Sequence, residues 1–288
     1  MRQTGGLLQW GVENPIKRAM LKLLSCLLIA AIPFTANALP SSSAVPGGVL
    51  VLPLTSAKTT APHVSFRGKR ALVVRDNGKW VALVGLPLSL TPGQYDLSVN
   101  NAMKKFRVVS KKYPEQRITI KDTRKVEPNP DDMQRINSEQ PKIDIAKNIF
   151  RDTQEVDLKL QLPADGPLSS RFGLRRIFNG QPRNPHAGLD IAIPTGTRVM
   201  SAANGKVIDT GDYFFNGNTV FVDHGQGLIT MYCHLSEINV NIGDVVTKGQ
   251  PLALSGMTGR VSGPHLHWSV IMNGTMIDPE IFVKAREE

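Results

Sequence analysis

Two histidines lie two positions apart in the stretch SGPHLHWSV, residues 262–270. Side chains on a β-strand alternate between its faces, so His265 and His267 share one face while Leu266 packs on the other. A buried strand has little use for adjacent imidazoles, because each brings polar nitrogens that need hydrogen-bond partners. Neutral imidazoles that converge on one point can instead bind a metal ion or transfer protons beside it. The pair alone leaves a structural or solvent-exposed role equally open.

A further imidazole and a carboxylate occur in NPHAGLD, where His186 precedes Asp190 by four residues and Gly188 lets the backbone bend. Histidine nitrogen and aspartate oxygen are both usual ligands of Zn²⁺. One histidine of the HLH motif would bring the set to three protein ligands. A catalytic zinc site uses three, because its remaining position must hold water or substrate.

Two histidines then remain for proton transfer: the other member of HLH, and His234 in TMYCHLS. A metal-bound water needs a group that accepts its proton, and a tetrahedral intermediate needs an acid for its leaving amine. Imidazoles suit both tasks near neutral pH. Strand alternation along ITMYCH predicts that Tyr232 and His234 share a face and that Cys233 lies in the core.

The other two histidines receive no chemical role. His224, in VDHGQG, follows a strand pattern with turn residues, and we expect it to be exposed. His63 lies in the first half of the chain, far in sequence from the other five.

The first 38 residues have the pattern of a secretory signal. Lys17, Arg18 and Lys22 flank the apolar run LLSCLLIAAIPF, which is followed by an A-x-A motif that ends at Ala38. The apolar run is too short to span a bilayer comfortably. The sequence therefore predicts export to the periplasm or cell envelope, with cleavage near Ala38.

Cysteine content and charge agree with an exported bacterial protein. Cleavage near Ala38 leaves Cys233 as the only cysteine, which excludes an intramolecular disulfide. The full chain carries a net charge of +10, and residues 1–38 hold four basic residues and one acidic residue, so the mature chain carries +7. A basic exported protein is drawn to the anionic cell wall or lipid headgroups, and the compartment disfavours nucleic acid as a partner. A charge that only aids solubility fits the composition equally well.

Turn chemistry divides the remaining chain into three parts. Residues 39–112 alternate like short strands, with hairpin signals at Asp76-Asn77-Gly78 and Asn100-Asn101, and predict a small antiparallel β-sandwich. Residues 113–157 form a linker with short helices, whose starts are expected after Pro130 and Pro141. Residues 158–288 have glycine or Asn-Gly at nearly every break, which indicates an all-β barrel-like or sandwich domain.

A basic run crosses the boundary between the first domain and the linker. Lys104–Lys125 holds nine basic residues against two acidic ones, Glu115 and Asp122. Such a run is more typical of a solvated strand edge or linker than of a binding patch.

Three motifs in order, NPHAGLD, MYCHL and SGPHLHW, resemble the HxxxD, YxHL and GPHLH signatures of the M23 peptidase family, the LytM- or lysostaphin-like zinc endopeptidases of bacterial cell walls. The resemblance covers roughly Leu162 to Val283 and implies a LytM-like barrel-sandwich domain with a duplicated hybrid motif. It implies one Zn²⁺ per chain and hydrolysis of peptidoglycan cross-links, D-Ala to diaminopimelate before glycine bridges. The implied metal ligands are His186, Asp190 and His267, and the implied catalytic pair is His234 and His265.

Two further positions bear on this resemblance. The family often has Phe-Glu after HLH, where this chain has Trp268-Ser269, so the groups around the ligands differ. Arg171, in SSRFGLR, matches a basic position that recurs near the substrate groove of relatives.

Three other functions fit parts of the pattern. A non-hydrolytic LytM-type regulator that activates a cell-wall amidase would keep the fold, but all five key positions are present here and favour an enzyme. IGDVVTKGQPLALSG resembles a biotinyl or lipoyl carrier, yet the expected Met-Lys pair is missing. A phosphotransferase component would work in the cytoplasm, which disagrees with the signal.

A wall hydrolase in the periplasm needs control. The linker carries Asp131, Asp132 and Asn137, whose side chains could reach a zinc ion. We expect the first domain or this linker to cover the groove in the full-length form, and we expect a monomer.

Overall fold

The computed structural model describes Met1, residues 39–54 and residues 60–283. Most of the regular structure in these residues is β, so the predicted all-β class is confirmed. The described residues from 39 to 283 form one compact unit. The secretory signal predicted for residues 1–38 lies outside the described residues. None of the described helices is long and apolar enough to cross a membrane.

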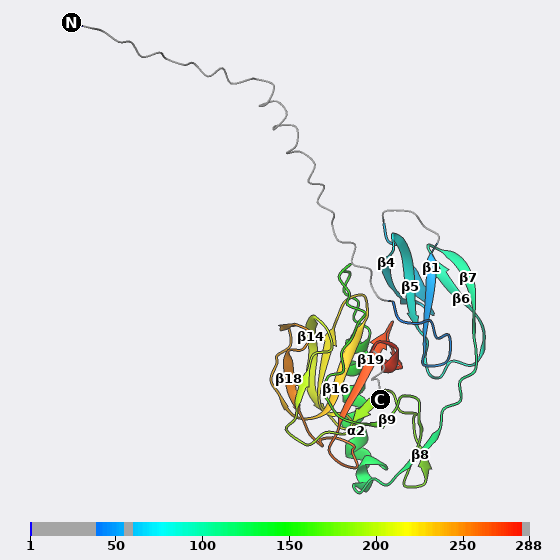
Figure 1. Ribbon diagram of the computed structural model, residues 1–288. Helices are drawn as coiled ribbons and strands as arrows, with labels where there is room; N and C mark the ends of the chain where they lie inside the picture. The colour runs from blue at the N-terminus through cyan, green and yellow to red at the C-terminus, as the bar shows by residue number, and fades with distance from the viewer. Residues whose placement is uncertain (2–38, 55–59, 284–288) are drawn as a thin grey trace. The chain divides into compact units, whose positions relative to one another are not determined.

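The N-terminal domain is the predicted β-sandwich (Figure 1). Its two antiparallel sheets have the strand orders β1-β5-β4 and β3-β2-β6-β7. The strands are β1 (Val49–Leu54), β2 (Val64–Phe66), β3 (Lys69–Arg70), β4 (Leu72–Asp76), β5 (Lys79–Gly85), β6 (Gly93–Val99) and β7 (Ala102–Val108). One apolar core, which includes Phe66, Trp80 and Leu97, draws on strands of both sheets.

Two tight turns set the strand register of this domain. Asn77 and Gly78, between β4 and β5, have φ values of 46° and 77°, and Asn100 and Asn101, between β6 and β7, have 48° and 67°. Positive φ at both central residues belongs to the type I′ turn, whose twist matches that of the strands, and Asn and Gly adopt it at low cost. Both predicted hairpins are confirmed.

A ten-stranded antiparallel sheet builds the C-terminal domain, with a main path β17-β14-β15-β16-β19-β12-β9 and with β13, β18 and β20 paired beside it. These strands are β9 (Leu168–Ser170), β12 (Leu189–Ile191), β13 (Arg198–Met200), β14 (Gly205–Tyr213), β15 (Gly217–Asp223), β16 (Ile229–Ile238), β17 (Val245–Val246), β18 (Pro251–Ser255), β19 (Leu266–Met272) and β20 (Thr275–Ile277). Tyr232, Leu266 and Trp268 are fully buried in the core of this domain.

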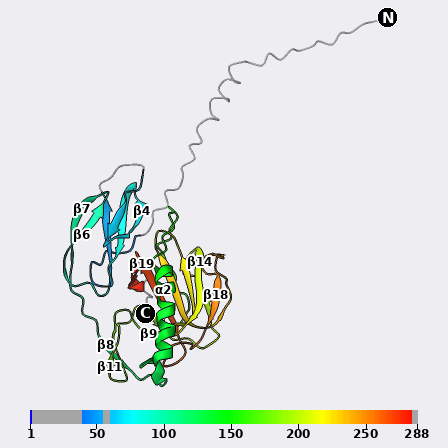
Figure 2. The same cartoon turned by 180° about the vertical axis from the view of Figure 1, so that it is seen from behind.

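The linker contributes one strand and one long helix. Strand β8 (Glu115–Ile118) runs parallel to β10 (Arg175–Phe178), which also pairs with β11 (Gln181–Pro182). After the 3-10 helix η1 (Thr123–Lys125), helix α2 (Pro130–Lys147) lies against the sheet, as Figure 2 shows, and a second 3-10 helix, η2 (Pro279–Ile281), follows the last strand. Ala146 of α2 packs with Phe221 and Ile229 in a core on this face of the sheet.

Helix α2 begins where the sequence predicts and continues where it does not. Asn129 caps the helix and forms a capping box with Asp132, and Pro130 occupies the first turn, where its missing N–H costs nothing. The predicted second start at Pro141 is wrong, because Pro141 lies inside α2. Packing of the C-terminal turn of the helix through Ala146 stabilises a single helix despite the lost backbone hydrogen bond.

The basic run begins on an exposed edge. Lys105 and Arg107 are exposed on β7, which is the last strand of its sheet. Charged side chains on an edge strand oppose pairing with another chain, in agreement with the predicted solvated edge.

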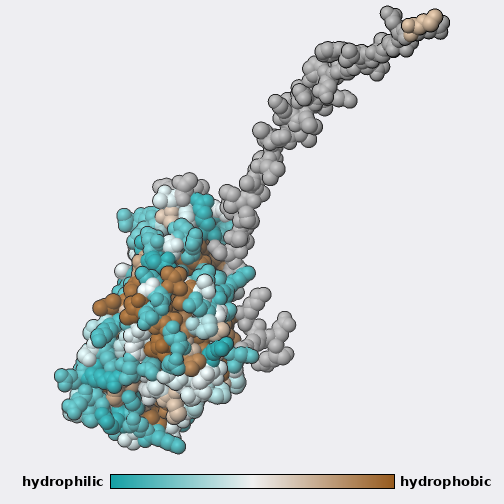
Figure 3. All heavy atoms as spheres, turned by 90° about the vertical axis from the view of Figure 1, so that its left-hand side faces the viewer, coloured by the Kyte–Doolittle hydropathy of each residue, from teal (hydrophilic) through white to brown (hydrophobic). Residues whose placement is uncertain are grey.

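Figure 3 shows apolar side chains gathered on one face among hydrophilic ones. The exposed large apolar residues of the C-terminal domain include Ile242, Val245 and Met257.

His224 is buried, so the prediction that it is exposed is wrong. Only 2% of its surface is accessible. Its Nδ1 lies 2.8 Å from the carbonyl oxygen of Asn204 and its Nε2 lies 2.8 Å from the hydroxyl of Thr230, which also bonds to the hydroxyl of Tyr232. The turn that follows β15 folds inward because both ring nitrogens find partners there.

This burial predicts a loss of stability in acid. Desolvation lowers the pKa of His224 from its ordinary value of 6.5, against the opposing effects of the Asn204 hydrogen bond and the Asp223 charge. The folded state therefore holds neutral His224, and the stability it contributes is fully present above pH 6.5 and is lost as the pH falls towards the folded-state pKa. Urea unfolding between pH 8 and pH 5 should show this fall. The fall should be shallower in His224→Gln but not absent, because the pKa values of His234 and His267 are also lowered.

Candidate metal centre and active site

His265, which immediately precedes β19, and His267 on β19 point toward the same carboxylate, as strand alternation predicts. Leu266 lies in the core. His265 Nε2 lies 3.8 Å and His267 Nδ1 lies 2.7 Å from the same oxygen, Oδ1 of Asp190. Asp190 reaches this place because β12 pairs with β19 in the register that puts Asp190 opposite His267.

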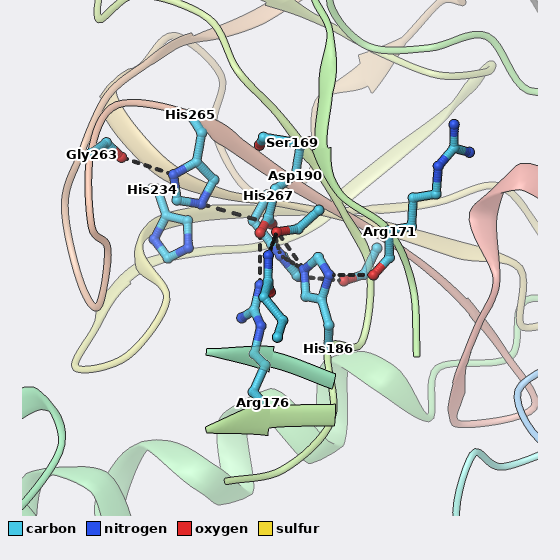
Figure 4. A network of polar contacts seen from close by, with 12 residues as sticks. Ser169, Arg171, Arg176, His186, Asp190, His234, Gly263, His265 and His267 are labelled. Atoms are coloured by element: carbon cyan, nitrogen blue, oxygen red, sulfur yellow. Dashed lines mark hydrogen bonds and ion pairs between the residues drawn. The ribbon is translucent and has the colours of Figure 1, made fainter. Parts of the chain in front are cut away.

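Three side chains converge on one point (Figure 4). His186 Nε2 lies 2.9 Å from Asp190 Oδ1 and 3.0 Å from His267 Nδ1, and the latter two atoms are 2.7 Å apart. Among the described residues, these three form the group of ligand-type side chains close enough to hold one metal ion. The structure thus brings together His186, Asp190 and His267, the three predicted ligands.

Neighbouring groups fix the direction of each donor atom. His186 Nδ1 donates to the carbonyl oxygen of Arg171 at 2.8 Å. In this tautomer the lone pair of Nε2 points toward the cluster. His267 Nε2 lies 2.9 Å from the hydroxyl of Ser269. A hydroxyl can accept as well as donate, so Ser269 suits the tautomer in which His267 Nδ1 is free to bind a metal. Arg176 Nη2 binds the second oxygen of Asp190 at 2.7 Å.

The protonation states suit a cation. Burial opposes ionisation of Asp190, but the hydrogen bonds and charges of His186 and His267 prevail and hold the pKa of Asp190 well below its ordinary value. Burial lowers the pKa of His267 to about 4. The ionised carboxylate of Asp190 and the neutral imidazole of His267 are the forms in which these side chains bind Zn²⁺.

The donor set fits a zinc ion. Two imidazole nitrogens and one carboxylate oxygen match the three-ligand pattern of catalytic zinc. The close approach of their segments requires a glycine. A Cβ on Gly188 would lie 2.5 Å from the carbonyl oxygen of Trp268 and 2.8 Å from His267 Nε2, so only glycine allows the segment between His186 and Asp190 to lie against β19.

His234 reaches the site through an unusual backbone conformation. Its φ of 64° lies in the left-handed region, next to a bulge in the pairing of β15 with β16. Tyr232 lies opposite Trp268, and both belong to the core, so regular alternation would also turn His234 to the core. The centre of the His234 ring instead lies 4.8 Å from the centre of the His265 ring. The predicted shared face of Tyr232 and His234 is therefore wrong, because the left-handed residue interrupts the alternation. Such strain is common at functional sites.

His234 and His265 form a pair beside the three-residue cluster. His234 Nδ1 donates to the carbonyl oxygen of Thr258 at 2.8 Å, and His265 Nδ1 donates to that of Gly263 at 2.9 Å. Each neutral ring therefore carries its lone pair on Nε2. Burial, followed by the neighbouring His265 and His267, lowers the pKa of His234 well below its ordinary value. The pair can accept and return protons.

A pocket of about 330 Å³ opens beside these groups. His234, His265 and Asp190 line it together with Arg176 and Arg260, and the rest of its wall comes from Gln116, Ile118, Ile120, Ser169, Ser170, Phe178, Ala192, Val261, Ser262, Gly263 and Pro264. A concave site with a few convergent polar groups is where a substrate is expected.

Comparison with known proteins identifies the family. A crystal structure assigned to peptidase M23 from Pseudomonas aeruginosa matches 84% of this chain and 95% of its own, at 43% identity and with a TM-score of 0.71. The chain belongs to peptidase family M23. The M23 peptidase family itself matches residues 184–279, and the M23 N-terminal domain family matches residues 42–112.

M23 relatives with curated names match part of this chain. Peptidoglycan DD-endopeptidase ShyA of Vibrio cholerae is 43% identical over 112 residues, which are 38% of this chain and 26% of ShyA. DD-carboxypeptidase/endopeptidase Mpg of Neisseria meningitidis is 37% identical over 112 residues, which are 39% of this chain and 26% of Mpg. The matched part thus spans about a quarter of the length of these two M23 relatives.

Several groups at this M23 site are not among the residues predicted from the sequence. Ser269 could have been found, because it follows His267 by two positions and therefore shares its face. Arg176 and the carbonyl of Thr258 carry no motif. The side chain of Arg171 points away from the cluster in Figure 4 and pairs with Glu280, so Arg171 contributes its backbone carbonyl.

The remaining M23 candidates lie as follows. Cys233 is buried, as predicted, and burial raises the pKa of its thiol to about 12. The linker residues expected near the zinc ion are elsewhere: Asp132 pairs with Arg124 and caps α2, while Asp131 and Asn137 are exposed on α2 and do not line the pocket.

Proposed function

We propose that this chain is a zinc-dependent endopeptidase that hydrolyses peptide cross-links of bacterial peptidoglycan. The observation that carries the proposal is the convergence of His186 Nε2, Asp190 Oδ1 and His267 Nδ1 beside the His234 and His265 pair at the wall of one pocket. The names of the M23 relatives, which include DD-endopeptidases, favour D-Ala to diaminopimelate cross-links over glycine bridges.

His186, Asp190 and His267 would hold one Zn²⁺ per chain. Bound there, zinc would supply Lewis-acid activation of water and of the scissile carbonyl. The chain's own residues prepare this position. Arg171 O and Ser269 Oγ orient the two imidazoles, and Arg176 holds the second carboxylate oxygen of Asp190.

His234 and His265 would move the protons. Each presents an unprotonated Nε2, because its Nδ1–H is engaged by a backbone carbonyl. One ring can accept a proton from the attacking water, and the protonated ring can then stabilise the developing oxyanion or pass the proton to the leaving amine.

Digestion of purified peptidoglycan sacculi tests this function. The native chain with added Zn²⁺ should release soluble muropeptides and should stop when the zinc is chelated. Absence of release by a folded, zinc-bound chain, also after its linker has been loosened as described below, would contradict the proposal, and an amidase-activating role would then be the function to examine.

We further propose that the protein acts in the periplasm or cell envelope as a monomer. The predicted secretory signal, the basic mature chain and the cell-wall enzymes among its relatives support this location. We also propose that the signal ends at residue 38, the N-terminal domain at residue 112 and the linker at residue 157.

We propose that the linker limits access to the site. Gln116, Ile118 and Ile120 line the same pocket as His234 and His265. The segment is held there by the pairing of β8 with β10, by a bond of 2.6 Å from Gln116 Nε2 to Ser170 Oγ, and by an apolar cluster of Ile118, Ile120, Val126 and Phe178.

Loosening this segment should raise activity. Ile120→Asp places a charge in the apolar cluster and should release the segment, because burying an unpaired carboxylate is costly. We expect sacculus digestion to accelerate by about 10-fold or more if the closed form dominates. Ile145→Asp, at an exposed position of α2, serves as the matched control. An unchanged or lower rate in Ile120→Asp, with the fold intact, would contradict the proposal.

A further inference from the structure

Arg260 lies in the wall of the active-site pocket without an anionic partner. It follows Gly259 in the segment between β18 and β19, and its backbone N–H binds the carbonyl oxygen of Phe215 at 2.8 Å. Its guanidinium carbon lies 4.4 Å from the ring centre of Phe215 and 5.1 Å from that of Phe178. The two rings hold the side chain in one place against the pocket.

Nothing in the described part of the chain neutralises this guanidinium. No carboxylate of the described residues forms an ion pair with Arg260, and no side-chain hydrogen bond of Arg260 is present there. Cation–π contacts offset only part of the hydration that a partly buried guanidinium loses. A cation in this position is therefore incomplete without an anion.

The neighbouring charges add to the positive potential. Arg176 lies in the same pocket, but Asp190 already pairs with it. Arg183, whose side chain binds backbone carbonyls and Gln181, has no carboxylate partner among the described residues either. Burial, followed by the charges of Arg176 and Arg183, lowers the pKa of Arg260 to about 10, so Arg260 stays charged at neutral pH. Positive charges held close together in a pocket favour an anionic ligand.

We propose that Arg260 is a specificity-determining residue that binds a carboxylate of the substrate peptide. This inference rests on the proposed function, since stem peptides of peptidoglycan carry free carboxylates next to their cross-links. The planar guanidinium can bind both oxygens of a carboxylate, and the Phe215 and Phe178 rings hold it in the pocket that His234 and His265 also line. The contact sets which amide of the bound peptide meets His234 and His265.

The test compares two forms of one substrate. The probes are a purified cross-linked muropeptide dimer with free carboxylates and the same dimer after its carboxylates have been converted to amides. The native chain should prefer the acidic dimer by about 10- to 100-fold in kcat/KM, the range expected for a hydrogen-bonded charge. In Arg260→Gln the ratio of the two kcat/KM values should fall close to 1, and Arg260→Lys should restore part of it.

The control is Arg198→Gln, which removes an exposed arginine from β13. It should keep the preference of the native chain. A preference that is unchanged in Arg260→Gln would overturn the inference while leaving the proposed function intact. An equal loss of activity by Arg260→Gln on both dimers would also overturn it, since it would indicate a structural role. Failure of the native chain to cleave either dimer would instead count against the proposed function itself.

Discussion

Asp190→Asn is expected to abolish both zinc binding and peptidoglycan hydrolysis. Asp190 Oδ1 is the atom shared by His186 and His267, and the substitution removes the only negative charge of the three-residue cluster. Changes to groups outside the ligand set of a metal site cost roughly 10- to 100-fold in metal affinity, so loss of a ligand should cost more. Zinc content after dialysis and the rate of sacculus digestion measure the two losses.

Stability must be followed in the same samples. Asp190 also pairs with Arg176, so the variant leaves a partly buried guanidinium without its partner and should unfold more easily. His267→Gln tests metal binding without this loss of stability, because it removes a ligand and keeps the ion pair of Asp190 with Arg176. Full zinc content with full activity in either variant would show that these residues do not hold the metal.

His234→Ala is expected to keep zinc and lose catalysis. His234 does not belong to the three-residue cluster, but its ring lies 4.8 Å from that of His265 at the pocket wall. Loss of a general acid or base typically lowers the rate by about 10²- to 10⁴-fold. The measurement is kcat on a purified cross-linked dimer at equal zinc content.

His63→Ala is the matched control for this variant, because it removes an exposed histidine from the N-terminal domain. Its kcat and zinc content should equal those of the native chain. A His234→Ala variant that retains more than about a tenth of the native kcat would place proton transfer on another group.

Local sequence patterns predicted side-chain directions and hairpins correctly where the backbone conformation was regular. Strand alternation placed His265 and His267 correctly, and the Asn-Gly and Asn-Asn turns predicted their hairpins, because these signals depend only on neighbouring residues. Strand alternation predicted the wrong face for His234. Its left-handed φ is set by the bulge between β15 and β16, a pairing that no local pattern reveals.

Long-range contacts account for the other errors. His224 is buried because its two ring nitrogens find Asn204 and Thr230 after folding. Pro141 stays inside α2, whose C-terminal turn packs on the sheet through Ala146. Gln116, rather than Asp131 or Asp132, reaches the pocket, because β8 pairs with β10 across more than fifty residues of sequence. Sequence spacing alone predicts none of these pairings.

The central claim is tested most directly by mass analysis of a purified cross-linked muropeptide dimer after incubation with the zinc-bound native chain. We expect that the dimer disappears and that its two monomers appear with the mass of one added water, while His234→Ala at equal zinc content leaves the dimer intact. Persistence of the dimer with the native chain, folded and zinc-loaded and with its linker loosened by Ile120→Asp, would contradict the account.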